Sequence, residues 1–68
     1  MTTSMVTADR QLTMPVPDSC SDRYAAGWAY ADWYIGKGGN LNADAPGDWH
    51  EEKAVGFWDR LTAEREAR

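Results

Sequence analysis

The chain has 68 residues, a formal net charge of −4 and a single cysteine, Cys20. A chain this short forms at most one domain and buries only about 60% of its unfolded surface. One cysteine excludes a disulfide scaffold and a cysteine-based zinc site, and it favours a reducing compartment. Residues 1–20 lack the apolar stretch of a signal peptide, and no apolar run approaches the about 20 residues of a membrane span. We therefore expect a cytoplasmic protein with no membrane contact.

Residues 1–20 are predicted to form an arm outside the helical domain. The segment is rich in threonine and serine, and its apolar residues do not follow helical spacing. Pro15 and Pro17 exclude a helix interior. We expect the arm to be extended or disordered, with residues 11–16 as the part that would lie extended across the helices. Residues 21–68 are predicted to form the helical domain.

The first helix is predicted over residues 21–35, starting near Ser19 or Ser21. Ser19 and Asp22 have the spacing of a capping box, and Gly36 is expected to end the helix in a left-handed conformation. The apolar residues form two stripes on nearly opposite faces. One stripe is Tyr24, Trp28, Ala31 and Ile35, and the other is Ala25, Ala26, Ala29 and Trp33. A helix that is apolar on two sides needs partners on two sides.

The second helix is predicted over residues 48–67, after a loop rich in glycine, asparagine and proline. Asp48 is expected to cap it, with Glu51 completing a capping box. Its apolar stripe comprises Ala54, Val55, Phe57, Trp58 and Leu61. The predicted fold class is therefore all-α, a two-helix hairpin with an extended N-terminal arm.

The second stripe of the first helix has no partner within this hairpin. Three candidates can cover it: the arm through Leu12, Met14 and Val16, a second copy of the chain, or a different molecule, and these alternatives stay open. A second copy would give a four-helix bundle. The aromatic residues are too many for one small core. We expect Trp28, Ile35, Phe57, Trp58 and Leu61 in the core, and a partner-binding face formed by Ala26, Ala29, Tyr30, Trp33 and Tyr34.

Two glycines stand inside the predicted helices, each followed by an aromatic residue. They occur in Ala25-Ala26-Gly27-Trp28 and in Ala54-Val55-Gly56-Phe57. Because glycine costs about 1 kcal/mol relative to alanine in a helix, the pattern indicates a close approach of backbone or ring at these positions. For Gly56 a second interpretation is a flat outer face beside Trp49 and Ala63.

Around these glycines the chain resembles ribosome modulation factor, a family of short bacterial helical hairpins. Tyr24-Ala25-Ala26-Gly27 is similar to the family's Tyr-x-Ala-Gly, and Gly56-Phe57-Trp58-Asp59-Arg60 is similar to its Gly-Trp-Arg-Glu-Ala. The resemblance implies a hairpin over about residues 22–66 and a ribosome-associated role. The family is strongly basic, whereas this chain has seven lysines and arginines against eleven acidic residues. We therefore expect no nucleic-acid binding.

The loop has a partial calcium-binding pattern. In an EF-hand register, the side-chain ligands would be Asn40, Asn42, Asp44, Asp48 and Glu51. Ala45 stands where the sharp turn needs glycine, and helix capping already explains Asp48 and Glu51. The preferred interpretation is a turn-rich loop without metal, and calcium is the alternative.

No catalytic arrangement is evident. His50 is the only histidine, and we expect it to be exposed in the first turn of the second helix. Cys20 and Ser21 have no evident base beside them. The sequence predicts neither an enzyme nor a cofactor nor a small-molecule substrate.

These observations favour a small non-enzymatic regulator that docks an aromatic helix face onto a partner protein. The alternatives are a structural or cementing subunit that associates with itself, and a ribosome-associated factor. The composition also resembles that of small phage accessory proteins, which would place the protein in the cytoplasm of a bacterial host.

Overall fold

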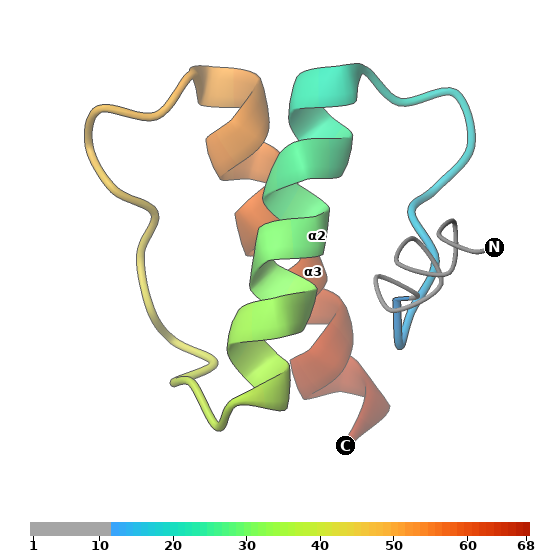
Figure 1. The fold of residues 1–68 in the computed structure, drawn as a ribbon. Coiled ribbons are helices and arrows are strands. Elements are labelled where there is room, and N and C mark those ends of the chain that lie inside the picture. The colour runs from blue at the N-terminus through green and yellow to red at the C-terminus, as the bar shows by residue number, and fades with distance from the viewer. Residues whose placement is uncertain (1–11) are drawn as a thin grey trace, which may run out of the picture.

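The computed structural model describes residues 12–68, and within them it contains two helices and no strand. Helix α2 spans Asp22–Gly36 and helix α3 spans Glu51–Ala67, and the two pack against each other along their length (Figure 1). The predicted all-α fold, in which two helices pack against each other, is confirmed. The expectations for residues 1–11 lie outside the described residues.

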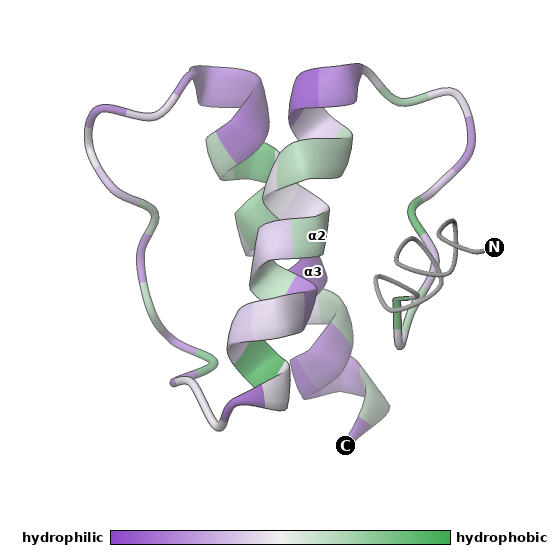
Figure 2. Ribbon diagram, viewed as in Figure 1, coloured by the Kyte–Doolittle hydropathy of each residue, from purple (hydrophilic) through white to green (hydrophobic). Residues whose placement is uncertain are grey.

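The two helices run in the same direction. Residues 37–50 return along the side of the pair, so that α3 starts at the same end as α2 (Figure 1). Hydrogen bonds between the helices agree with this direction. The Ser21 hydroxyl donates to Glu52 near the helix starts, and Arg60 donates to Asp32 two to three turns further along both helices. The loop and residues 12–20 flank the helix pair on opposite sides in this view. Both helix N-termini therefore lie at one end, where Figure 2 shows hydrophilic first turns.

Helix α2 begins at the second of its two predicted starts. The Ser21 side chain accepts a hydrogen bond from the backbone N–H of Tyr24 (3.1 Å), which makes Ser21 the N-cap. Ser19 lies outside the helix with a φ of 64°, so its capping box with Asp22 is wrong. Capping by Ser21 satisfies one of the free N–H groups of the first turn.

Helix α2 ends in a Schellman motif centred on Gly38. The backbone N–H of Gly38 donates to the Ile35 carbonyl and that of Gly39 to the Tyr34 carbonyl, both at 2.9 Å. Gly38 has a φ of 89°, which glycine adopts without a steric penalty. The prediction that Gly36 takes this conformation is wrong, because Gly36 is the last helical residue.

Helix α3 begins three residues later than predicted. The backbone N–H of Trp49 donates to the Pro46 carbonyl (3.2 Å), which closes a turn that contains Asp48. The N-cap is instead His50, whose Nδ1 accepts from the backbone N–H of Glu52 (3.1 Å). The predicted capping by Asp48 is therefore wrong.

The buried face of α3 is rotated from the predicted stripe. Ala54, Phe57 and Leu61 are buried as expected, together with Gly56 and Arg60. Trp58, predicted in the core, is 42% exposed, and Val55 is also exposed. On α2, Trp28 and Ala31 are buried, and Ile35 packs partly buried against the core. Arg60 takes the interior position because Asp32 of α2 pairs with it.

The glycines bring the two backbones into contact. A Cβ atom on Gly27 would overlap the Lys53 carbonyl oxygen, and one on Gly56 would overlap the Tyr24 carbonyl oxygen. The predicted close approach is confirmed at both positions. The alternative for Gly56, a flat outer face, is wrong because Gly56 is buried in the helix interface.

Candidate functional site

The outer side of α2 carries exposed aromatic rings. Trp33 is 55% exposed and Tyr30 is 41% exposed, and their ring centroids lie 5.3 Å apart in an edge-on arrangement. Ala26 is exposed one turn before Tyr30 on the same side of the helix. The structure thus brings together three of the five residues of the predicted partner-binding face.

The loop adds a third ring to this group. The Trp49 ring packs edge-on against Tyr30, with centroids 5.0 Å apart. Trp49 also packs edge-on against Phe57 (5.6 Å), which is one of the most deeply buried core residues. The exposed rings therefore rest on the core, which restricts their motion before any partner binds.

Each of the two tryptophans at this surface carries a lysine over its ring. Lys37 Nζ lies 4.4 Å from the Trp33 ring centroid, and Lys53 Nζ lies 4.1 Å from that of Trp49. Such cation–π contacts contribute about 0.5–1 kcal/mol at exposed sites. Lys37 and Lys53 are the only lysines in the sequence. We call this group the aromatic–lysine surface: Tyr30, Trp33, Lys37, Trp49 and Lys53.

Sequence reasoning placed Tyr34 among the exposed anchors, but the structure gives it another position. Tyr34 is half-buried against Phe57, and its hydroxyl accepts from the backbone N–H of Asn40 (3.3 Å). It therefore holds the loop against the core. Ala29 is also half-buried.

The predicted face did not include Trp49 or the two lysines, although the spacing of each lysine from a tryptophan is a usable signal for the lysines. Lys37 follows Trp33 by four residues, and Lys53 follows Trp49 by four residues. Residues four apart are neighbours on a helix surface.

The arm covers a different side of α2. The Trp28 indole Nε1 donates to the Met14 carbonyl (2.8 Å), and Asp32 accepts from the backbone N–H groups of Thr13 (3.1 Å) and Met14 (3.2 Å). Leu12, Met14 and Val16 are half-buried and alternate with exposed residues as in an extended segment, but they do not cover Tyr30 and Trp33, so the alternative in which the arm packs over that face is wrong. Within residues 12–68, this arm leaves Trp33 and Ala26 uncovered.

Asp32 and Arg60 form a buried ion pair between the helices. Arg60 Nε donates to Asp32 Oδ2 (3.0 Å), and the Arg60 side chain is 1% exposed. Burial by itself would raise the pKa of Asp32, but hydrogen bonds from Thr13, Arg60 and Met14 outweigh it and lower the pKa below its ordinary value. Glu64 Oε1 lies 2.9 Å from Arg60 Nη1, although within residues 12–68 no acceptor is aligned with that nitrogen's N–H groups.

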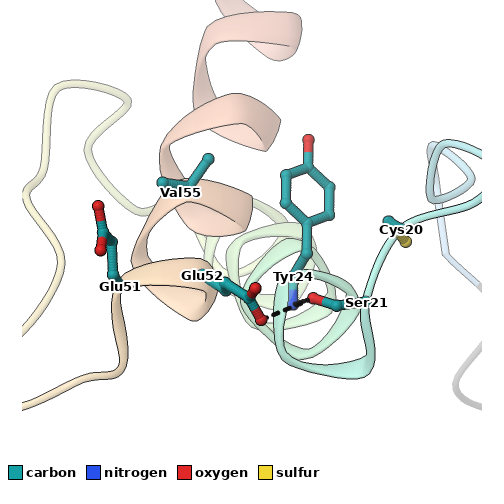
Figure 3. A pocket seen from close by; sticks show the side chains of 6 residues that line it. All are labelled: Cys20, Ser21, Tyr24, Glu51, Glu52 and Val55. Atoms are coloured by element: carbon teal, nitrogen blue, oxygen red, sulfur yellow. Dashed lines mark hydrogen bonds between the residues drawn. The ribbon is translucent and has the colours of Figure 1, made fainter.

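A pocket of about 440 Å³ opens between the two helix starts (Figure 3). It is lined by Cys20, Ser21, Tyr24, Glu51, Glu52 and Val55. The Ser21 hydroxyl donates to Glu52 Oε1 (3.1 Å), and the Tyr24 hydroxyl donates to Asp59 (2.6 Å). Both hydroxyl groups are thus engaged within the protein, and we place the candidate site at the aromatic–lysine surface instead.

The Tyr24 contact makes a prediction for alkaline pH. Burial and then the hydrogen bond to the Asp59 carboxylate raise the pKa of Tyr24 to about 12. The contribution of neutral Tyr24 to the free energy of unfolding is fully present below the ordinary tyrosine pKa of 10.0 and is lost as the pH rises towards 12. An ultraviolet titration of tyrosinate should show one late step that Tyr24→Phe removes and Asp59→Asn moves to lower pH. A late step unaffected by either change would contradict the assignment.

The residues of the calcium pattern are placed in the loop and at the start of α3. Asn40 Oδ1 accepts from the backbone N–H of Asn42 (2.8 Å), and Asp44 Oδ1 accepts from the Trp58 indole (2.9 Å). In the part of the chain that the structure describes, no three histidine, cysteine or acidic side chains gather as metal ligands. Asp44, Asp48 and Glu51 are therefore not brought together.

Comparison with protein families, with curated proteins and with solved structures found no match. The resemblance to ribosome modulation factor therefore stays a prediction from the residues quoted above. Over residues 12–68, neither helix is long and apolar enough to cross a membrane.

Proposed function

We propose that this chain is a small non-enzymatic regulator that binds a partner protein through the aromatic–lysine surface. The observation that supports this most strongly is the exposure of Trp33, more than half of whose surface is open. Tryptophan and tyrosine dominate the binding energy of protein interfaces, particularly where a rigid surface supports them. Binding would act by occlusion, because a docked chain covers the partner's own surface.

The chemistry of this surface indicates which kind of partner surface would be complementary to it. Tyr30, Trp33 and Trp49 offer an apolar centre, and Lys37 and Lys53 place positive charge directly beside it. A complementary surface has an apolar side chain with carboxylates around it, since opposite charges favour the correct encounter and like charges oppose it. Tyr30 and Trp49 pack against Phe57, and Trp33 packs against Tyr30, so binding orders few additional side chains.

The arrangement of basic residues favours a protein over a nucleic acid. Binding to phosphates requires accessible lysines and arginines along one face. In the described residues, Arg60 is buried, Arg65 donates to the Leu41 carbonyl, Arg68 pairs with Glu64, and Arg23 stands exposed beside Asp22 at the start of α2. This distribution offers no continuous basic stripe.

The proposal predicts a preference between two synthetic peptides. One carries a tryptophan flanked by glutamates, and the other carries the same tryptophan flanked by lysines. We expect the acidic peptide to bind at least about tenfold more tightly, which corresponds to about 1.4 kcal/mol. Binding to the ¹⁵N-labelled protein, dilute enough to be monomeric, should shift the indole signals of Trp33 and Trp49 and leave that of Trp28 in place.

Two variants provide the controls for this experiment. Trp33→Ala should lose the preference, whereas Glu66→Ala, an exposed change at the end of α3, should retain it. Acidic-peptide shifts that avoid Trp33 and Trp49, or equal shifts of these two signals with both peptides, would rule out the proposed docking surface.

A further inference from the structure

Helix α3 carries a second exposed apolar surface with the opposite charge. Trp58 is 42% exposed and Val55 is 36% exposed. The Trp58 indole donates to the Asp44 carboxylate (2.9 Å), so negative charge lies directly against this ring. Glu51 and Asp59 are each four residues from Val55 and are therefore its neighbours on the helix. We call this group the tryptophan–carboxylate surface: Asp44, Glu51, Val55, Trp58 and Asp59.

This second surface has the composition required of the partner. It presents an apolar centre, Val55 and Trp58, with carboxylates around it, whereas the first surface presents aromatic rings with lysines over them. From this complementarity we infer that a second copy of the chain docks its tryptophan–carboxylate surface onto the aromatic–lysine surface of the first. The inference rests on the proposed function, because it takes that docking surface as given and names its occupant.

The two surfaces point away from each other. Trp33 lies two residues from Ala31, which is fully buried against α3, and positions two apart face nearly opposite sides of a helix. Trp58 has the same relation to the buried Arg60 on α3. The complementary surfaces thus occupy opposite outer sides of the helix pair. Docking one onto the other joins copies head to tail, and such an interface adds further copies unless the rotation closes a ring.

A symmetric dimer through the aromatic–lysine surface is disfavoured by charge. It would bring the lysine-bearing surface of one copy against the same surface of the next. Like charges facing each other across an interface cost free energy, whereas the head-to-tail arrangement places each lysine opposite carboxylates. The same docking hides Trp33, so association would compete with any other partner of that surface.

A complementation experiment separates these arrangements. Trp33→Ala disables one surface and Trp58→Ala disables the other. By sedimentation, each variant alone should associate at least about tenfold more weakly than the unaltered chain, because each removes a central aromatic contact. An equimolar mixture of the two should recover a one-to-one complex, since each variant retains the surface that the other lacks. Circular dichroism should show both variants folded, and Val55→Lys gives a second test of the α3 surface.

A charge exchange provides an independent check. Lys37→Glu should abolish association of the chain with itself, and mixing with a Glu51→Lys chain should restore part of it. High salt should weaken association of the unaltered chain.

The outcomes distinguish failure of the head-to-tail arrangement from failure of the docking surface. Association lost with Trp33→Ala but retained with both Trp58→Ala and Val55→Lys would overturn the head-to-tail arrangement. A chain that stays monomeric at every concentration, yet binds the acidic peptide, would also overturn it and would leave the proposed function standing. Loss of peptide preference in the unaltered chain would remove the docking surface itself, and with it both proposals.

Discussion

Replacing Asp32 with alanine is expected to leave the protein largely unfolded at room temperature. The change would remove the interhelical carboxylate from the Arg60 guanidinium, which is 1% exposed, and would leave Glu64 of the same helix as its remaining carboxylate neighbour in the described residues. Breaking a buried ion pair from one side costs about 3–5 kcal/mol. The hydrogen bonds that Thr13 and Met14 donate to Asp32 would be lost as well, which leaves the bond from the Trp28 indole to the Met14 carbonyl to hold the arm on α2. Small domains have a total stability of about 5–15 kcal/mol, and a chain this short lies towards the lower end.

Urea unfolding followed by circular dichroism measures this effect. Asp48→Ala removes an exposed carboxylate and should change the free energy of unfolding by no more than about 0.5 kcal/mol. The double change Asp32→Leu with Arg60→Met should be more stable than Asp32→Leu alone, because it leaves no buried charge without a partner. If Asp32→Ala behaved like Asp48→Ala, the ion pair would not hold the helices and the arm together.

The second large effect is expected at the helix crossing. Gly27→Ala and Gly56→Ala should each destabilise the protein by about 1–3 kcal/mol or more, because the added methyl group overlaps a backbone carbonyl of the other helix. Helix propensity alone would give the opposite sign, since alanine is about 1 kcal/mol better than glycine in a helix.

Gly36 provides the matched control for this prediction. It is also a glycine of α2, but a Cβ atom there would meet nothing within 4 Å. Gly36→Ala should therefore leave the midpoint of thermal unfolding unchanged or raise it. Equal behaviour of Gly27→Ala and Gly36→Ala would show that the two backbones do not touch in solution.

Much of the fold follows from local sequence patterns. The spacing of apolar residues and the serine and glycine signals place both helices within a few residues of their observed bounds. The direction of α3 relative to α2 could not be read from the sequence, because a loop over residues 37–50 is long enough for either arrangement. Gly27 and Gly56 did predict a close approach of the helix backbones, and the structure shows it.

The errors arise where a distant contact overrides a local preference. Trp58 fits the apolar stripe of α3, yet it is exposed because Arg60 takes the interior position to pair with Asp32. Apolar periodicity cannot reveal that a charged residue has a buried partner on another helix. Asp48 is a favourable cap, but the turn closed by Trp49 and Pro46 removes it from the helix start.

The sequence predicted part of the candidate site, and distant contacts again account for the rest. Tyr30 and Trp33 were expected on the outside because the core is too small for every ring, and both are exposed. Tyr34 shares the same stretch of helix but packs against the loop through Asn40 and Gly39. Trp49 reaches Tyr30 because residues 37–50 run back along the helix pair, and no local sequence pattern predicts that path.

In the head-to-tail arrangement, Trp33 of one copy and Trp58 of the next lie at one interface. Fluorine NMR of protein labelled with 5-fluorotryptophan tests it directly, because the sequence has only four tryptophans and single Trp→Phe variants assign each signal. With rising protein concentration, we expect the signals of Trp33 and Trp58 to shift together, while that of the buried Trp28 stays in place. Signals for Trp33 and Trp58 that do not change with concentration, or a shift of Trp33 without Trp58, would contradict the head-to-tail account.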